Sequence, residues 1–191
     1  IDVTTATLTA TPSVAEGGNI VYTATLTNPA DTAVTVTLST GETITIAAGA
    51  TTGTVAIAAP ADDRYLDAGS VSRTIASAAG GNFESLAVNP AAATTTVTDT
   101  IDVTTATLIA TPSVAEGGTI TYTVTLGAPV TGSPVNVTLA NGQVVAIPVG
   151  ASSGTVTAIA PDDVYGGGAS VGNAIVSASG GNFESLVPNT A

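Results

Sequence analysis

Residues 1–26 read IDVTTATLTATPSVAEGGNIVYTATL, and residues 101–126 read IDVTTATLIATPSVAEGGTITYTVTL. The second stretch departs from the first only at the counterparts of positions 9, 19, 21 and 24. The segment GGNFESL also recurs, at 80–86 and at 180–186. A period of about 100 residues is the size of one independent domain and far exceeds that of a solenoid repeat. The sequence therefore predicts two tandem copies of one domain, residues 1–100 and residues 101–191.

Each copy consists of short alternating stretches separated by turn residues, a pattern typical of a β-sandwich. In the first copy, Ile20, Tyr22, Ala24 and Leu26 share one face of an expected strand, which predicts that this face is buried. We therefore expect an all-β fold of two tandem immunoglobulin-like β-sandwich domains with about seven strands each. The strands expected in the first copy cover residues 3–10, 20–27, 34–39, 43–47, 53–59, 70–78 and 93–99.

Two places depart from this regular pattern. Arg73 has the same parity as Val71 and Ile75, so we expect a bulge or a sheet edge in the stretch 70–78. The second copy reaches Ala191 without a counterpart of TTTVTDT, residues 94–100 of the first copy. We expect its last strand to be missing.

The composition excludes several classes of function. The chain has 2 Lys+Arg against 14 Asp+Glu, a formal net charge of −12 and no His or Cys. Nucleic acids and anionic membrane surfaces are bound mainly through basic side chains, so neither is an expected partner. Without His or Cys there is no Ser-His or Cys-His nucleophile, no ordinary zinc site and no disulfide. No apolar run is long enough for a membrane-spanning helix, and we expect no membrane insertion.

The acidic residues lie in expected loops and at strand ends. In an immunoglobulin-like sandwich, the loop with Glu16, the loop with Asp62 and Asp63, and the end of the last strand with Asp99 gather at one pole. Asp102 then opens the second copy. Like charges so close repel each other unless a cation binds between them. Six to eight oxygen ligands in a flexible geometry suit Ca²⁺ better than Mg²⁺.

The sequence therefore predicts a calcium site at the junction between the copies. Solubility alone would also account for acidic loops on a largely uncharged sandwich, and the chain has no EF-hand loop. The main candidate ligands are Glu16, Asp62, Asp63, Asp99 and Asp102. A secondary set consists of Asp67, Glu116, Asp162, Asp163 and Glu184.

Both copies resemble the extender repeats of large bacterial RTX adhesins of the LapA type. The resemblance covers nearly the whole chain and includes loops as well as strands. It is carried by TLTATPSVAEGG at 7–18, VYTATLTNPA at 21–30, GGNFESL at 80–86 and VTDTID at 97–102. In that family, calcium at junctions between repeats is understood to stiffen a stalk. The family's acidic junction falls here on Glu16, Asp62, Asp63, Asp99 and Asp102, whereas Asp67 is replaced by Gly167 in the second copy.

The resemblance implies a structural role. It implies spacer repeats of a surface adhesin that project a distal adhesive region for biofilm formation or cell adhesion. It also implies export by type I secretion and an extracellular, outer-membrane-tethered location in a Gram-negative bacterium. The expected partners are neighbouring repeats of the same polypeptide, with no small-molecule substrate, and the fragment is expected to be monomeric.

Two other functions are compatible with parts of the sequence. Threonine rows at Thr23, Thr25, Thr27 and at 94–96 could present hydroxyl groups to a glycan or to ice, although Thr is also common on exposed strand faces. The pair Asp62-Asp63 could in principle hydrolyse glycosidic bonds. Adjacent residues of an extended segment point to opposite sides, however, so we expect no enzyme activity.

Overall fold

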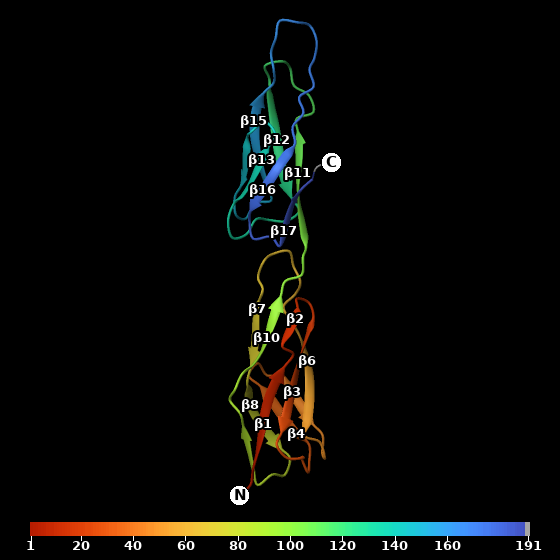
Figure 1. The fold of residues 1–191 in the computed structure, drawn as a ribbon, viewed down its shortest axis with the longest axis vertical. Helices are drawn as coiled ribbons and strands as arrows, with labels where there is room; N and C mark the ends of the chain where they lie inside the picture. The colour runs from red at the N-terminus through yellow and green to blue at the C-terminus, as the bar shows by residue number, and fades with distance from the viewer. Residues whose placement is uncertain (190–191) are drawn as a thin grey trace. The chain divides into compact units, whose positions relative to one another are not determined.

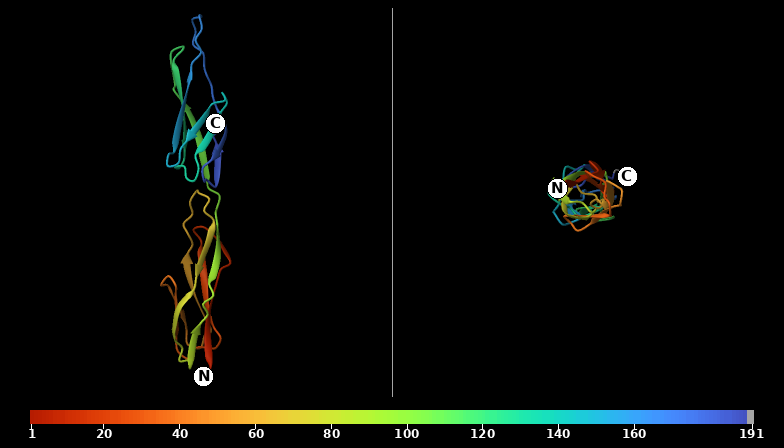
Figure 2. Two further views of the ribbon diagram at one scale, coloured as in Figure 1. Left: turned by 90° about the vertical axis from the view of Figure 1, so that its left-hand side faces the viewer. Right: turned by 90° about the horizontal axis from the view of Figure 1, so that it is seen from below.

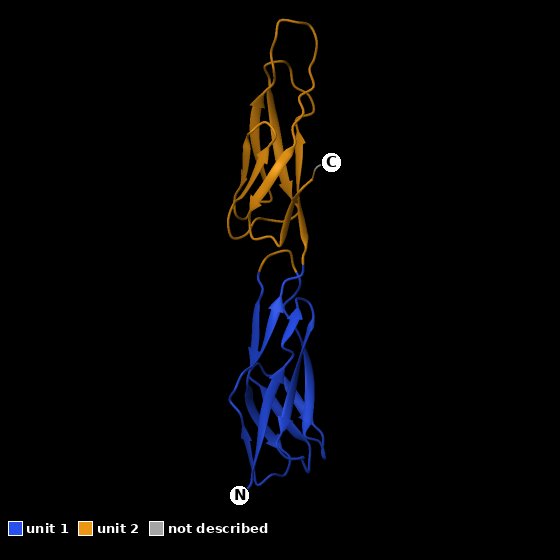
Figure 3. Cartoon of the chain, in the orientation of Figure 1, with its two compact units in different colours: residues 1–62, 67–100 blue, residues 63–66, 101–191 orange. Residues whose placement is uncertain are grey.

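The computed structural model describes residues 1–189 and contains strands but no helix in that range (Figures 1 and 2). The all-β fold predicted from the sequence is confirmed. The described residues accordingly contain no helix that could cross a membrane. The chain divides into two compact units (Figure 3). Unit 1 comprises Ile1–Asp62 and Asp67–Thr100, and unit 2 comprises Asp63–Leu66 and Ile101–Ala191.

Unit 1 contains three sheets. The largest has the order β6-β3-β1-β9, and a second has the order β5-β4-β8. The third has the order β2-β10-β7. The strands are β1 (Val3–Ala10), β2 (Ser13–Ala15), β3 (Asn19–Leu26), β4 (Val34–Leu38), β5 (Thr43–Ile46), β6 (Thr52–Ala58), β7 (Gly69–Arg73), β8 (Ile75–Gly80), β9 (Ser85–Val88) and β10 (Ala93–Thr98).

The core of unit 1 lies between the two larger sheets and follows the predicted alternation. Ile20, Tyr22 and Ala24 of β3 are fully buried in one cluster with Val36 of β4 and Ile44 of β5. The hydroxyl groups of Thr35 and Thr45 lie on the opposite, exposed face of their strands. Each large apolar side chain removed from water contributes roughly 1.5–3 kcal/mol to folding. The buried face of these strands therefore holds the sandwich together.

The expected strand over 70–78 is two strands in different sheets. It is interrupted at Thr74, so that β7 pairs with β10 whereas β8 pairs with β4. The register of β4 and β8 shifts between Thr37 and Leu38, which is the expected bulge. The short strands β2 and β9 were not predicted from the sequence, because three or four residues carry too little periodicity to be recognised.

Unit 2 repeats the two larger sheets, as β15-β12-β11-β17 and β14-β13-β16. In its described residues no strand corresponds to β2, β7 or β10. Its core contains Tyr122, Val124, Val137 and Phe183. The strands are β11 (Val103–Ala110), β12 (Thr119–Leu126), β13 (Val135–Leu139), β14 (Val144–Ile147), β15 (Ser153–Ile159), β16 (Ile175–Gly180) and β17 (Ser185–Pro188).

The short segment 63–66 belongs to the fold of unit 2 although it lies in the first copy of the sequence. The Tyr65 ring stacks on Phe183 with 5.4 Å between ring centroids, and its hydroxyl donates to the Pro129 carbonyl at 2.8 Å. The Leu66 amide donates to the Asn182 carbonyl at 2.9 Å, and the side-chain amide of Asn182 donates to the Leu66 carbonyl at 2.8 Å. The chain therefore passes between the units three times, at 62/63, 66/67 and 100/101.

Candidate metal centre

Two of the predicted ligands are brought together by a parallel strand pair in unit 1. β2 lies parallel to β10 with Thr96 beside Ser13 and Thr98 beside Ala15. The next residue of each strand in the same register is Glu16 on one side and Asp99 on the other. The Glu16 amide donates to the Thr98 carbonyl at 3.1 Å, which continues the ladder up to these two acids. Their proximity is thus a consequence of strand register.

The third acid comes from the other neighbour of β10. β7 is antiparallel to β10, with Val97 opposite Gly69, and this register extended by two residues places Asp67 opposite Asp99. The Asp67 amide donates to Oδ1 of Asp99 at 3.3 Å. Neighbouring strands lie about 4.8 Å apart, and residues in one row project to the same side. Three carboxylates therefore share one row at the end of the sheet β2-β10-β7.

These three residues form the acidic group of unit 1. One carboxylate oxygen from each of Glu16, Asp67 and Asp99 lies within 4.8 Å of the others. Glu16 is only 6% exposed, Asp99 is half-buried and Asp67 is exposed. The group thus has a buried base and an open side through which an ion could enter.

The loop after Glu16 follows a conformation that requires glycine. Gly17 has φ +68°, and its amide donates to the Pro60 carbonyl at 2.7 Å. A Cβ atom on Gly18 would lie 2.6 Å from Cγ2 of Val14, which is closer than side chains approach. The Glu-Gly-Gly sequence therefore turns the chain sharply from β2 while Glu16 stays in the row of acids.

The electrostatics of the group favour a bound cation. Two negative charges about 5 Å apart repel by about 3 kcal/mol at an effective dielectric constant near 20. The cost is greatest for a buried carboxylate such as Glu16, because burial removes its hydration. Carboxylate oxygens are ligands for hard divalent cations, and water can complete the coordination shell on the exposed side. The acidic group could therefore hold a metal ion.

The other main candidates lie outside this group. The carboxylate of Asp62 accepts a hydrogen bond from the Thr100 hydroxyl within unit 1. Asp63 belongs to unit 2, where its Oδ1 accepts from the Tyr65 amide at 2.7 Å. The Asp102 amide donates to Oε2 of Glu184 at 2.6 Å, also in unit 2. Asp62 and Asp63 thus order the loop before Asp67.

The secondary candidates are divided in the same way. Asp67 completes the acidic group. From the sequence it belongs only to the secondary set, because Gly167 replaces it in the second copy. Glu116, the counterpart of Glu16, is exposed. Asp163 accepts from the Tyr165 amide at 2.8 Å, and Asp162 lies beside Gly117. Asp67 is identified as a candidate ligand by the register of β7 against β10. Predicting this register from the sequence would require knowing where β7 begins.

One of the threonine rows is not an exposed surface. Thr95 is fully buried, and its hydroxyl donates to the Thr11 carbonyl at 2.7 Å. Adjacent residues of β10 alternate between faces, so only Thr94 and Thr96 of this row face outward. The expectation of three outward hydroxyls at 94–96 is therefore wrong for the central one.

The fold and the acidic group define a class of tandem β-sandwich repeat in which a carboxylate cluster ends a sheet. The family model named LapA domain matches residues 2–100 and again residues 102–191. The chain therefore belongs to the LapA domain family. This membership supports an adhesin-related repeat role and a surface-exposed protein.

Comparisons with other proteins add little to the family assignment. No curated protein has a significant sequence match to the chain. Among solved structures, the human OSCAR ligand-binding domain is similar at 13% sequence identity and a TM-score of 0.28. That alignment covers 81% of this chain and 82% of the OSCAR chain. A similarity this low has no bearing on function.

Proposed function

We propose that the two repeats are spacer segments of an extracellular adhesin, and that Ca²⁺ bound by Glu16, Asp67 and Asp99 stiffens them. The observation that carries this proposal is the row of three carboxylates, one of them buried, in a chain with only 2 Lys+Arg. Calcium suits the group because it accepts carboxylate and water oxygens in a flexible geometry. The repeats would project a distal adhesive region of the same polypeptide, secreted by a type I system and tethered at the outer membrane.

The position of the acids along the chain suggests how an ion would act. Asp67 directly follows the segment 63–66, which belongs to unit 2, and Asp99 lies two residues before Ile101, where the chain enters unit 2 again. The chain passes between the units at three places. An ion bound to both residues would fix the chain of unit 1 beside two of them, 66/67 and 100/101. Fewer conformations would remain open to the connecting segments, and the repeats would behave more like a rod. Asp62, Asp63 and Asp102 would support the site by ordering these segments.

The calcium part of the proposal is tested by thermal unfolding of the whole chain in calcium and in EDTA. An ion at 100 times its dissociation constant stabilises the folded state by about 2.7 kcal/mol. We expect calcium to raise the transition of unit 1 and to leave that of unit 2 unchanged. Asp67→Asn should abolish most of the shift, whereas Glu116→Gln, an exposed acid in unit 2, should preserve it. Equal melting curves with and without calcium would disprove ion binding.

The stiffening part needs a distance measurement. The chain has no Cys, so Thr45→Cys and Ala146→Cys, both at exposed strand positions, would provide unique sites for two spin labels. Calcium should narrow the distribution of distances between the labels, and the same experiment on Asp67→Asn should give a broad distribution in both conditions. A spacer should also bind no sugar on a glycan array. If calcium shifts the melting temperature but leaves the distance distribution unchanged, the stiffening part of the proposal is disproved and the ion-binding part stands.

A further inference from the structure

Arg64 and Arg73 are the two basic residues of the chain. A protease that requires a basic side chain before the cleaved bond can therefore cut these repeats only at Arg64–Tyr65 and at Arg73–Thr74. Arg64 belongs to the segment 63–66 of unit 2 (Figure 3), whereas Arg73 is the last residue of β7 in unit 1. The two bonds are therefore protected by different parts of the fold.

The bond after Arg73 is held by paired backbone on both sides. Arg73 pairs with Ala93 of β10. The Thr74 amide donates to the Ser39 hydroxyl oxygen at 3.3 Å, and the Thr74 carbonyl accepts from the Ser39 amide at 2.9 Å. Proteases cut backbone that has opened, so the rate of cutting follows the population of the open form. A cut after Arg73 thus requires the sheet β2-β10-β7 to open.

The bond after Arg64 is held by contacts within unit 2 alone. The Arg64 carbonyl accepts from the Glu184 amide at 3.1 Å, and the Arg64 guanidinium donates to the Gly127 carbonyl at 3.2 Å. Tyr65 forms an isolated antiparallel bridge to Phe183, on which its ring also stacks. No strand lies between the end of β6 and the start of β7, a stretch that is described without a gap. This segment can therefore leave unit 2 without breaking any strand.

We propose that Arg64–Tyr65 is a gated cleavage site for a protease specific for basic residues. Water adds across this peptide bond, which leaves a carboxylate on Arg64 and an amine on Tyr65. The bond is shielded while Tyr65 stays on Phe183, and it is open to the protease when the segment 63–66 leaves unit 2. A local opening of this kind needs less free energy than the unfolding of a whole unit.

The residues around the bond define the kind of protease that fits it. Asp62 and Asp63 precede Arg64, and Asp67 lies two residues after Tyr65. A fitting protease has an acidic pocket for the guanidinium and positive charges beside that pocket, because negative charges facing the aspartates would repel them. Trypsin has the acidic pocket and is therefore a suitable probe of the site.

A cut at this bond would divide the chain but not unit 1. The pairs β1–β9, β2–β10 and β4–β8 each join a strand before the cut to a strand after it. Unit 1 would therefore hold both fragments together without a covalent bond. The cut lies between two of the three connections to unit 2, 62/63 and 66/67, and leaves 100/101 as the covalent path. Cleavage would thus loosen the link between the repeats instead of releasing a fragment.

The site is tested by limited digestion of the whole chain with trypsin in EDTA, which keeps the test independent of the proposed ion site. Mass spectrometry of the products identifies each cut. We expect the cut after Arg64 to be at least about tenfold faster than the cut after Arg73. It should also be at least about tenfold slower than in the free peptide of residues 59–69, APADDRYLDAG. Both fragments should elute together in size-exclusion chromatography and separate in denaturant.

Three results of this digestion would overturn the proposal. A first cut after Arg73 would show that cleavage follows the unfolding of unit 1. A chain that is never cut after Arg64 while the peptide is digested would remove the site, and a chain cut as fast as the peptide would remove the gate. Fragments that separate in native buffer would disprove the loosened but unbroken link.

The gate is tested by variants of the docked tyrosine. Tyr65→Ala removes the ring stack and the hydrogen bond to the Pro129 carbonyl, and it should speed the cut after Arg64 by about tenfold or more. Tyr65→Phe keeps the ring and should speed this cut less. The cut after Arg73 should keep its rate in both variants, and Tyr165→Ala, which removes an exposed tyrosine, should change neither rate. Unchanged cutting after Arg64 in Tyr65→Ala, or equal acceleration of both cuts, would overturn the gate.

Discussion

The two copies begin with almost the same 26 residues, yet the equivalent glutamates of units 1 and 2 differ in burial. Glu16 is buried in unit 1, and Glu116 is exposed in unit 2. The loop that holds them has the same positive φ at Gly17 and Gly117, so local conformation does not account for the change. The strand β10 does, because it lies beside Glu16 and has no counterpart in the described residues of unit 2. The burial of this candidate ligand therefore depends more on the neighbouring strand than on the local sequence motif.

The aromatic residues of the two units give a second contrast. Tyr65 and Tyr165 follow the same Asp-Asp pair in each copy. Tyr65 stacks on Phe183 within unit 2, and Tyr165 is 78% exposed. Phe183 is buried as a result, whereas Phe83 of unit 1 is only partly buried. Equivalent residues therefore contribute unequally to the stability of the two units.

The largest expected difference is between Phe183→Ala and Phe83→Ala. Truncating a buried phenylalanine costs about 3–5 kcal/mol, through lost burial and the cavity left behind. We expect Phe183→Ala to destabilise unit 2 by an amount in this range and Phe83→Ala to destabilise unit 1 by clearly less. Urea unfolding followed separately for the two units would measure both. Equal losses would show that the stacked Tyr65 adds nothing to Phe183.

The pair Tyr65→Ala and Tyr165→Ala sharpens the same contrast. Tyr65→Ala removes a ring stack and the hydrogen bond to the Pro129 carbonyl, and we expect unit 2 to lose about 2 kcal/mol. Tyr165→Ala should change stability by less than about 0.5 kcal/mol, as is usual for exposed sites. Thermal unfolding at equal protein concentration would compare them. A large loss for Tyr165→Ala would mean that its loop is ordered by contacts other than those described.

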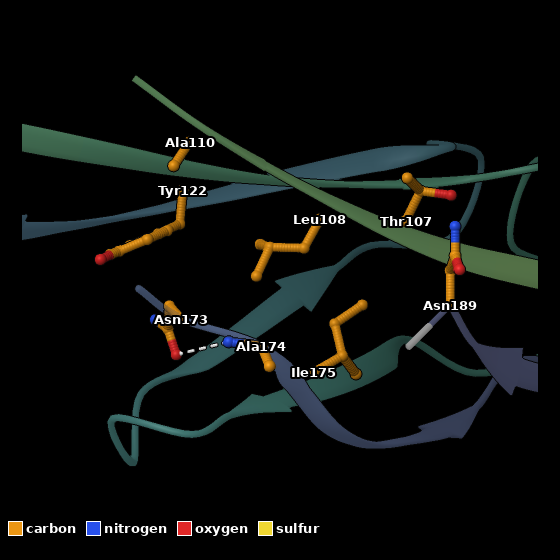
Figure 4. A pocket seen from close by; sticks show the side chains of 8 residues that line it. All are labelled: Thr107, Leu108, Ala110, Tyr122, Asn173, Ala174, Ile175 and Asn189. Carbon is orange, nitrogen blue, oxygen red and sulfur yellow. Dashed lines mark hydrogen bonds between the residues drawn. The ribbon is translucent and has the colours of Figure 1, made fainter. Parts of the chain in front are cut away.

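The smallest expected effect concerns the core tyrosines. The hydroxyl of Tyr22 is buried without a hydrogen-bond partner in the described residues, and burial raises the pKa of this phenol. Tyr22→Phe should therefore leave unit 1 equally stable or stabilise it by up to about 1 kcal/mol. Tyr122 lines a cavity of about 220 Å³ in unit 2 (Figure 4), so Tyr122→Phe should be neutral. Differential scanning calorimetry can resolve such a shift. A loss of stability in Tyr22→Phe would reveal a buried water on the hydroxyl.

Much of the fold could be predicted from the sequence, since alternation along 20–27, 34–39 and 43–47 identifies buried faces directly. The division of 70–78 into two strands could be detected only as an irregularity at Arg73. At the acidic group, Glu16 and Asp99 lie at ends of elements that topology gathers at one pole. Asp67 depends on the exact register between β7 and β10, which the sequence does not reveal. The incorporation of 63–66 into unit 2 was equally inaccessible, because the same motif at 162–165 leaves Tyr165 exposed.

The parallel strand pairs of unit 1 have a mechanical consequence. β1 lies parallel to β9, and the terminal strand β10 lies parallel to β2, close to the N-terminal strand in sequence. When such a unit is pulled by its two ends, the hydrogen bonds between β2 and β10 are sheared together instead of being unzipped one by one. We expect the β2–β10 pair to let unit 1 withstand more tension than strand pairs that unzip could. A unit clamped in this way resists stretching until the whole β2–β10 pair breaks at once.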